Sequence, residues 1–111
     1  MKLKKIIELL DAKKLNNCCD EETEVCAACG SDLMSDVLAF VKDQAMLLTG
    51  LVNPQVIRTA EMMDMKAIVF VRGKIPGDEI ITLSDEVGIA VLSTNDPLYV
   101  ACGKLYAEGL R

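Results

Sequence analysis

The sequence predicts an α/β fold in which helices cover both faces of a mainly parallel β-sheet. Three uninterrupted apolar stretches begin at residues 45, 67 and 90. The intervals between them are long enough for the strand–helix–strand crossover that joins parallel strands. None of the stretches alternates apolar with polar residues, which is typical of parallel strands buried on both faces. The length of 111 residues suits one domain, so we expect a single domain over residues 1–111.

Four short apolar segments are the expected strands. Ala45–Thr49, Ala67–Val71 and Ala90–Ser93 are the three central ones. Val25–Cys29 lies before them and ends at Gly30, which also favours a buried strand, with a loop as the alternative.

Two helices are expected before residue 45. The first has apolar residues at positions 3, 6, 7 and 10, which form one face of a helix. Between the two helices, asparagines at positions 16 and 17 and an acidic run at 20–22 indicate turns and loops. The second helix follows Ser31, whose side chain can cap it, with Asp32 in the first turn, where the helix dipole favours an acid. Its expected buried stripe consists of Leu33, Met34, Val37, Leu38 and Val41.

Three further helices alternate with the central strands. Asn53 precedes Pro54, which places a capping side chain before a proline at the first helical position. Asp96 and Pro97 repeat this arrangement after the last strand. The helix before the last strand opens on acidic residues 78 and 79 and is expected to end at Gly88.

The composition excludes several classes of function. The chain has 12 basic and 17 acidic residues, which disfavours a nucleic-acid partner because phosphates are bound by clustered lysine and arginine. It has five cysteines and no histidine, which excludes Ser-His-Asp hydrolases, Cys-His nucleophiles and histidine-based zinc catalysis. No apolar run approaches the ~20 residues that cross a bilayer, and we expect no signal peptide. We therefore expect a cytoplasmic protein with no membrane partner, whose cysteines are thiols or metal ligands.

The carboxyl ends of the parallel strands are the expected ligand site. Open α/β sheets bind ligands at this edge, in a crevice where the strand order reverses. The helix N-termini after Asn53 and Asp96 would present backbone N–H groups to an anion such as a nucleotide phosphate. The residues expected at the site are Ser31, Asp32, Thr49, Asn53, Ser93, Thr94 and Asn95.

Two groups of charged residues could either bind a ligand or simply be solvated. Asp32 and Asp36 are four residues apart and would share one helix face. Such a pair could bind magnesium or act in acid–base chemistry, but we favour a first-turn acid plus a solvated face. The loop from Arg72 to Lys74 carries two positive charges and either contacts a phosphate or is simply solvated, which we favour.

Four cysteines in the first third of the chain, Cys18, Cys19, Cys26 and Cys29, are its most conspicuous feature. All-thiolate ligation suits zinc or an iron–sulfur cluster, and thiols also support redox chemistry. In a strand, however, Cys26 and Cys29 would point to opposite faces, and the adjacent side chains of Cys18 and Cys19 are expected to diverge. We therefore interpret these thiols, and Cys102 at its helical spacing, as small apolar packing groups. No metal or other cofactor is predicted, and a site made of the four cysteines remains the alternative.

The segment at residues 25–39 resembles the DRTGG domain family; it reads Val-Cys-Ala-Ala-Cys-Gly-Ser-Asp-Leu-Met-Ser-Asp-Val-Leu-Ala. The similarity is most specific at residues 30–37, includes Gly103–Tyr106 and spans nearly the whole chain. The family is similar in fold to the N-terminal domain of bacterial HPr kinase, which implies a three-layer α/β sandwich. The family signature would fall at residues 24–28, where this chain has neither the arginine nor the two glycines. Because alanine does not allow the backbone freedom of glycine, the role of the signature is expected to change here.

The resemblance also implies a non-catalytic accessory or regulatory module. DRTGG domains occur in phosphotransacetylases and between the CBS domains of some family II pyrophosphatases, where they accompany regulation by adenine nucleotides. We therefore expect a single DRTGG-like regulatory or ligand-binding domain, not an enzyme, that senses an adenine nucleotide or another anionic small molecule and forms a homodimer. The alternative is a cysteine-dependent redox or metal/iron–sulfur accessory protein with a redox-protein partner in hydrogenase-type systems. A third hypothesis is an enzyme in which Asp32 and Asp36 hold a metal.

Overall fold

Five strands and five helices are present in the computed structural model, which describes residues 1–40 and 42–111. The strands are β1 (Lys13–Lys14), β2 (Ala27–Gly30), β3 (Ala45–Thr49), β4 (Ala67–Phe70) and β5 (Ala90–Ser93). The helices are α1 (Leu3–Leu10), α2 (Met34–Phe40), α3 (Pro54–Met62), α4 (Asp78–Val87) and α5 (Leu98–Ala107).

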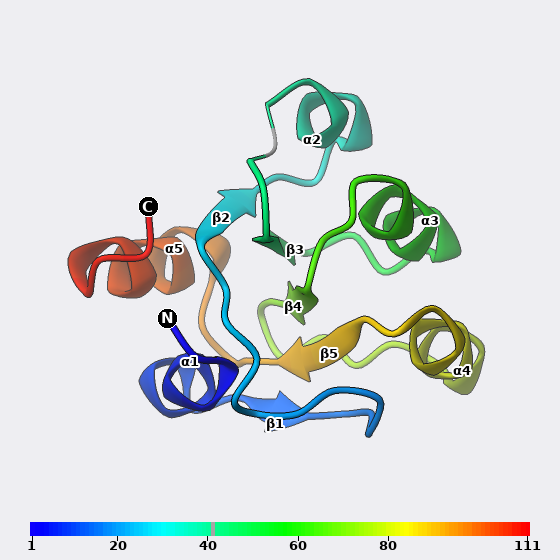
Figure 1. Ribbon diagram of the computed structural model, residues 1–111, viewed down its shortest axis with the longest axis horizontal. Helices are drawn as coiled ribbons and strands as arrows, with labels where there is room; N and C mark the ends of the chain where they lie inside the picture. Colours follow the sequence, from blue (N-terminus) through cyan, green and yellow to red (C-terminus); the bar gives the residue numbers. More distant parts are fainter. Residues whose placement is uncertain (41) are drawn as a thin grey trace.

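The strands form one sheet in the order β1-β5-β4-β3-β2 (Figure 1). The pairs β2–β3, β3–β4 and β4–β5 are parallel, and β1 pairs with β5 in the antiparallel sense. Each parallel connection contains one helix, as the intervals in the sequence predicted. The mainly parallel sheet of the expected α/β fold is confirmed.

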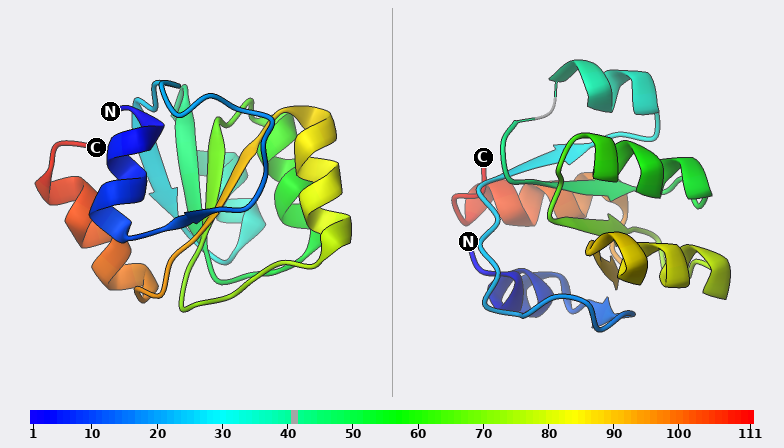
Figure 2. Two further views of the ribbon diagram at one scale, coloured as in Figure 1. Left: turned by 90° about the horizontal axis from the view of Figure 1, so that it is seen from below. Right: turned by 45° about the vertical axis from the view of Figure 1, so that its right-hand side comes forward.

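Helices cover both faces of this sheet (Figures 1 and 2). The helices α2, α3 and α4 lie on one face, and α1 and α5 lie on the other. Successive residues of β4, and Val71 directly after it, face the two helix layers in turn, because side chains of an extended chain alternate between faces. Ile68 and Phe70 pack in the core under α2–α4, whereas Val69 and Val71 pack in the core under α1 and α5. All four are fully buried, and the predicted three-layer sandwich is confirmed.

Most element boundaries agree with the sequence prediction. The strands β3 and β5 have the expected ranges, β4 ends one residue early, and β2 is displaced towards Gly30. Asn53 caps α3, because its Oδ1 accepts a hydrogen bond from the Gln55 N–H at 2.8 Å. Gly88 ends α4 with a φ of 77°, a left-handed conformation that glycine adopts without steric cost.

The start of α2 was predicted wrongly. The helix begins at Met34, because the Ser31 hydroxyl accepts from the Leu33 N–H at 3.0 Å and forms a turn before it. Asp32 therefore lies outside the helix and does not share a helix face with Asp36. Of the expected buried stripe, Val37 is fully buried, whereas Leu33 and Leu38 are exposed; Val41 lies outside the described residues.

The start of α5 was also predicted wrongly. Pro97 is itself the cap residue, with an extended ψ of 161°, and Asp96 makes no capping hydrogen bond to the helix. The Asp96 carboxylate instead accepts a hydrogen bond at 2.8 Å from the ammonium of Lys104, which lies in the second half of α5. Lys104 thus binds the carboxylate that the sequence pattern Asp96–Pro97 had assigned to capping the N-terminus of α5.

The sheet edge at β5 contains a residue that the sequence analysis assigned to a turn. Asn16 is 3% exposed, and its side-chain amide bonds to the backbone of β5 and its flank. The Oδ1 accepts from the Val91 N–H at 2.9 Å, and the Nδ2 donates to the Ile89 carbonyl at 2.7 Å. The amide thus continues the antiparallel ladder beyond the two-residue strand β1.

None of the described helices has both the length and the apolar character that a bilayer crossing requires.

Candidate functional site

The loops after the parallel strands gather at the C-terminal edge of the sheet. The central feature of this edge is Asp32, which lies between β2 and α2. Its Oδ1 accepts from the Thr49 hydroxyl at 2.9 Å and from the Gly50 N–H at 2.7 Å. Thr49 is fully buried at the end of β3. Its hydroxyl therefore holds the Asp32 carboxylate close to the end of that strand. The carboxylate therefore joins the β2 and β3 loops.

The hydrogen bonds at Asp32 favour its ionised form. The Gly50 N–H is the largest cause of the lowered pKa of this carboxyl, followed among the favourable causes by the Thr49 hydroxyl. The positive charges of Arg72 and Lys74 lower the pKa further. The group is therefore a carboxylate at neutral pH.

A pH dependence of stability follows from this pKa. The ordinary pKa is 3.8, and the folded chain binds this proton less readily than the unfolded chain does. The resulting stabilisation is present above pH 3.8 and is lost as the pH falls through the lower folded pKa. We expect urea unfolding to show that the stability advantage of the wild type over Asp32→Asn shrinks as the pH falls from 6 to 3. An advantage independent of pH would contradict this assignment.

Two cations from the loop after β4 approach the same point. The Lys74 ammonium donates to the Gly50 carbonyl at 2.6 Å. A Cβ added to Gly50 would lie 2.5 Å from Nη2 of Arg72, so glycine at this position lets the guanidinium lie against the backbone. Arg72 itself has a φ of 59°, which is uncommon for a residue with a side chain. Neither cation forms an ion pair with a carboxylate among the described residues.

A pocket of about 240 Å³ lies on the other side of this loop, at the end of β5. Lys13 reaches it from the antiparallel strand β1, whose register places it beside Ser93. The Ser93 hydroxyl donates to the Lys74 carbonyl at 2.8 Å, which connects the pocket to the cation loop. The lining residues are Asp11, Ala12, Lys13, Gly73, Ile75, Ser93 and Asn95.

The seven residues expected at the site are divided by the structure into three groups. Asp32 and Thr49 are in direct contact, and Ser93 and Asn95 line one pocket. The remaining three serve the fold locally: Ser31 forms the turn before α2, Asn53 caps α3, and Thr94 is 2% exposed. The Thr94 hydroxyl donates to the Leu10 carbonyl at 2.7 Å and thus holds the end of α1.

Two residues of this edge were absent from the sequence prediction. Gly50 was overlooked because its role, the close approach of Arg72, depends on a loop 22 residues away in sequence. Lys13 was overlooked because two lysines carry no strand signal and β1 reaches the edge only by pairing with β5. The expected crevice at a reversal of strand order was also wrong, because β2 to β5 lie in the sheet in unbroken chain order.

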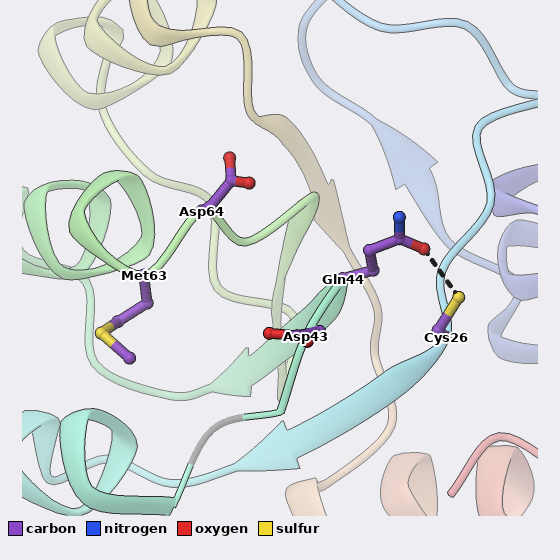
Figure 3. Close-up of a pocket in the computed structure, with 5 residues that line it drawn as sticks. All are labelled: Cys26, Asp43, Gln44, Met63 and Asp64. Carbon is purple, nitrogen blue, oxygen red and sulfur yellow. Dashed lines mark hydrogen bonds between the residues drawn. The ribbon is translucent and has the colours of Figure 1, made fainter.

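A larger pocket of about 480 Å³ lies at the opposite, N-terminal edge of the strands (Figure 3). It is lined by Met63, by the carboxylates of Asp43 and Asp64, and by Cys26, whose thiol donates to Oε1 of Gln44 at 2.8 Å. Among the residues that the structure describes, no basic side chain lines it. Two carboxylates without a cation repel an anion, so this pocket does not suit the anionic ligand that the sequence analysis anticipated.

The four N-terminal cysteines do not converge on one point. Cys26 lies before β2 at the pocket just described, whereas Cys29 packs against the core under α2–α4. Within residues 1–40 and 42–111, no three cysteine or carboxylate side chains are arranged as metal ligands. The expected divergence of Cys18 and Cys19 is wrong, because their Sγ atoms are 3.0 Å apart. The alternative of a site made of all four cysteines therefore has no support.

Helix α5 exposes apolar side chains on its outer face. Tyr99 is 89% exposed and Tyr106 60% exposed, while Ala101 and Leu105 on the inner face are buried. Large apolar side chains gathered on the exposed side of a helix often mark an interaction surface. This face is the candidate surface for the homodimer that the sequence analysis expects, which remains a prediction.

Comparisons with known proteins give a fold but no family. No family model matches the chain, and no curated protein matches it. Among solved structures it is similar to the CBS and DRTGG domains of the regulatory region of Clostridium perfringens pyrophosphatase, with a TM-score of 0.77 and 19% identity. The similarity covers 94% of this chain and 45% of that chain, so this protein spans slightly less than half of its structural neighbour. That structure is a complex with an activator, diadenosine tetraphosphate.

Proposed function

We propose that this chain is a DRTGG-like, non-catalytic regulatory domain that binds an anionic small molecule, foremost an adenine nucleotide, at the C-terminal edge of its sheet. The observation that carries this proposal is the pair of cations, Arg72 and Lys74, at the backbone of Gly50. Both are exposed, and among the described residues neither forms an ion pair with a carboxylate, although their charges lower the pKa of nearby Asp32. A phosphate would accept their N–H groups in charge-assisted hydrogen bonds.

The neighbouring groups suit binding rather than catalysis. Asp32 is held ionised by its hydrogen bonds, which makes it a poor proton donor near neutral pH. The chain has no histidine that could exchange a proton at that pH. The nucleotide activator of the structural neighbour supports the same class of ligand for this chain.

The proposal is tested by calorimetric titration with AMP, ADP, ATP and diadenosine tetraphosphate. The informative variant is Lys74→Ala, since a hydrogen bond to a charged group contributes about 1.5–3 kcal/mol. We expect the dissociation constant of the bound nucleotide to rise roughly tenfold or more, which corresponds to about 1.4 kcal/mol. Inorganic tripolyphosphate, titrated in parallel, shows whether the base is recognised in addition to the phosphates.

Lys66→Ala is the matched control. It removes the same charge from the residue just before β4, at the opposite edge of the sheet. We expect it to leave the affinity within a factor of about two, as for a remote surface charge. Absence of any binding at millimolar concentration, or equal losses in the two variants, would contradict the proposal.

A further inference from the structure

Two adjacent thiols meet at the C-terminal end of α4, at the edge of the sheet opposite the proposed ligand site. The Sγ atoms of Cys18 and Cys19 are 3.0 Å apart. Cys18 is exposed and Cys19 partly exposed, so small reagents can reach the pair. The segment between β1 and β2 that contains them lies beside α4 (Figure 2).

Several contacts with α4 and its cap hold this pair in place. The Asp85 carboxylate accepts from the backbone N–H of Asn17 at 3.3 Å and from that of Cys18 at 3.2 Å. The Cys19 thiol lies 3.3 Å from the Gly88 carbonyl, to which it donates. The backbone N–H groups of Asn17 and Cys18 and the side chain of Cys19 are therefore oriented by the C-terminal end of α4.

The other three thiols have different surroundings. Cys26 donates to Gln44, and the side chains of Cys29 and Cys102 pack against the two separate cores of the sandwich. Within the described part of the chain, none of these three is hydrogen bonded to another thiol. The close approach of two sulfur atoms is therefore specific to residues 18 and 19.

We propose that Cys18 and Cys19 form a redox-modifiable dithiol that closes to an intrachain disulfide when it meets a low-molecular-weight disulfide such as oxidised glutathione. In the first step one cysteine thiolate attacks a sulfur of the reagent, forming a mixed disulfide and releasing one glutathione thiolate. The second cysteine, after losing its proton, attacks the protein sulfur of that mixed disulfide and releases the other glutathione. The two protein thiols are thereby oxidised by two electrons, and one oxidised glutathione becomes two reduced ones.

The surroundings make this reaction slow but do not oppose an uncharged product. Burial, Cys19 and the nearby Asp85 raise the pKa of the Cys18 thiol to about 12, so its thiolate is scarce at neutral pH. Exchange is then expected over minutes to hours. A disulfide carries no charge, so Asp85 does not oppose it. Oxidation also removes the proton that Cys19 donates to Gly88 and so weakens one contact of the segment with α4.

The first test uses a chain in which only the pair remains, with Cys26, Cys29 and Cys102 replaced by serine. After incubation with oxidised glutathione, the intact mass of the folded chain is expected to fall by two hydrogen atoms, with no free thiol left after unfolding. A lasting glutathione adduct on the chain, or two thiols that remain free, would overturn the proposal. Cys19→Ser in the same background is expected to keep the adduct on Cys18, because the second attack is then missing.

The second test uses the otherwise unaltered chain, so it does not depend on how the serine variants fold. Phenylarsine oxide forms two As–S bonds with a close dithiol and releases water. We expect one arsenical per native chain, complete protection of the pair against oxidised glutathione, and loss of binding in Cys18→Ser. Binding that is the same in wild type and Cys18→Ser would overturn the proposal, as would no binding to the native chain.

Discussion

Asn16→Asp is expected to lower the free energy of unfolding by about 3–5 kcal/mol at neutral pH, the usual cost of an uncompensated buried charge. The amide at this position is 3% exposed and makes one bond in each direction with the backbone around β5. A carboxylate could still accept from the Val91 N–H, but it would face the Ile89 carbonyl with no proton to donate. Two oxygen atoms would then repel each other where a 2.7 Å hydrogen bond now exists.

The introduced carboxyl gives this prediction a distinctive pH dependence. Burial raises its folded pKa above the unfolded value, so the destabilisation is present above the unfolded pKa and declines as the pH falls. Once protonated, the group has one donor and one acceptor and reproduces the bonding of the amide. Urea unfolding is therefore expected to show a difference from the wild type that is largest near pH 7 and smaller near pH 4.

The adjacent Asn17→Asp is the matched control. This side chain is exposed, and the same change of charge occurs one residue away. We expect a loss of less than about 1 kcal/mol, as for an ordinary surface substitution. Equal losses in the two variants would show that the Asn16 amide does not complete the ladder of β5.

Phe70→Ala is expected to destabilise the domain by about 3–5 kcal/mol, the range found for large-to-small substitutions of buried aromatic residues. Phe70 is the last residue of β4 and is fully buried in the core under α2–α4. Removing its ring leaves a cavity between the sheet and the helix layer in addition to the lost burial. Since domains of this size are stabilised by only about 5–15 kcal/mol, a large part of the stability depends on this one ring.

The chain contains one other phenylalanine, which serves as the control. Phe40 is the last residue of α2 and is 75% exposed. Phe40→Ala is expected to change the unfolding free energy by no more than about 0.5 kcal/mol. Guanidinium or urea unfolding of both variants measures the contrast, and comparable losses would contradict the assignment of Phe70 to the core.

The location of the candidate site was predictable, because polar residues follow strands that the sequence indicates to be parallel. The polar residues after β3 and β5 do lie at one edge, because parallel strands end on the same side. Their individual roles were not predictable. Thr94 follows β5 in the position where a hydroxyl could bind a ligand. It is buried instead and donates to the carbonyl of Leu10, which precedes it by 84 residues at the end of α1.

Asp32 shows the same competition between near and distant partners. Its position after Ser31 satisfies the local rule for an acid in the first turn of a helix. In the folded chain the carboxylate has two donors from the end of β3, at 2.9 and 2.7 Å, and the helix begins two residues later. A pattern within one segment carries no information about donors that arrive from another strand.

The layers of this protein follow from patterns that are local in the sequence. Unbroken apolar runs define the parallel strands, since only a sheet covered on both faces buries every side chain of a strand, and proline, asparagine and glycine mark the ends of α3 and α4. Which polar groups are free at the sheet edge, and which form hydrogen bonds within the fold, depends instead on the packing of distant segments. Hydrogen bonds and close steric contacts depend on distances of a few ångströms between segments remote in sequence, as Asn16 with Val91 and Gly50 with Arg72 show.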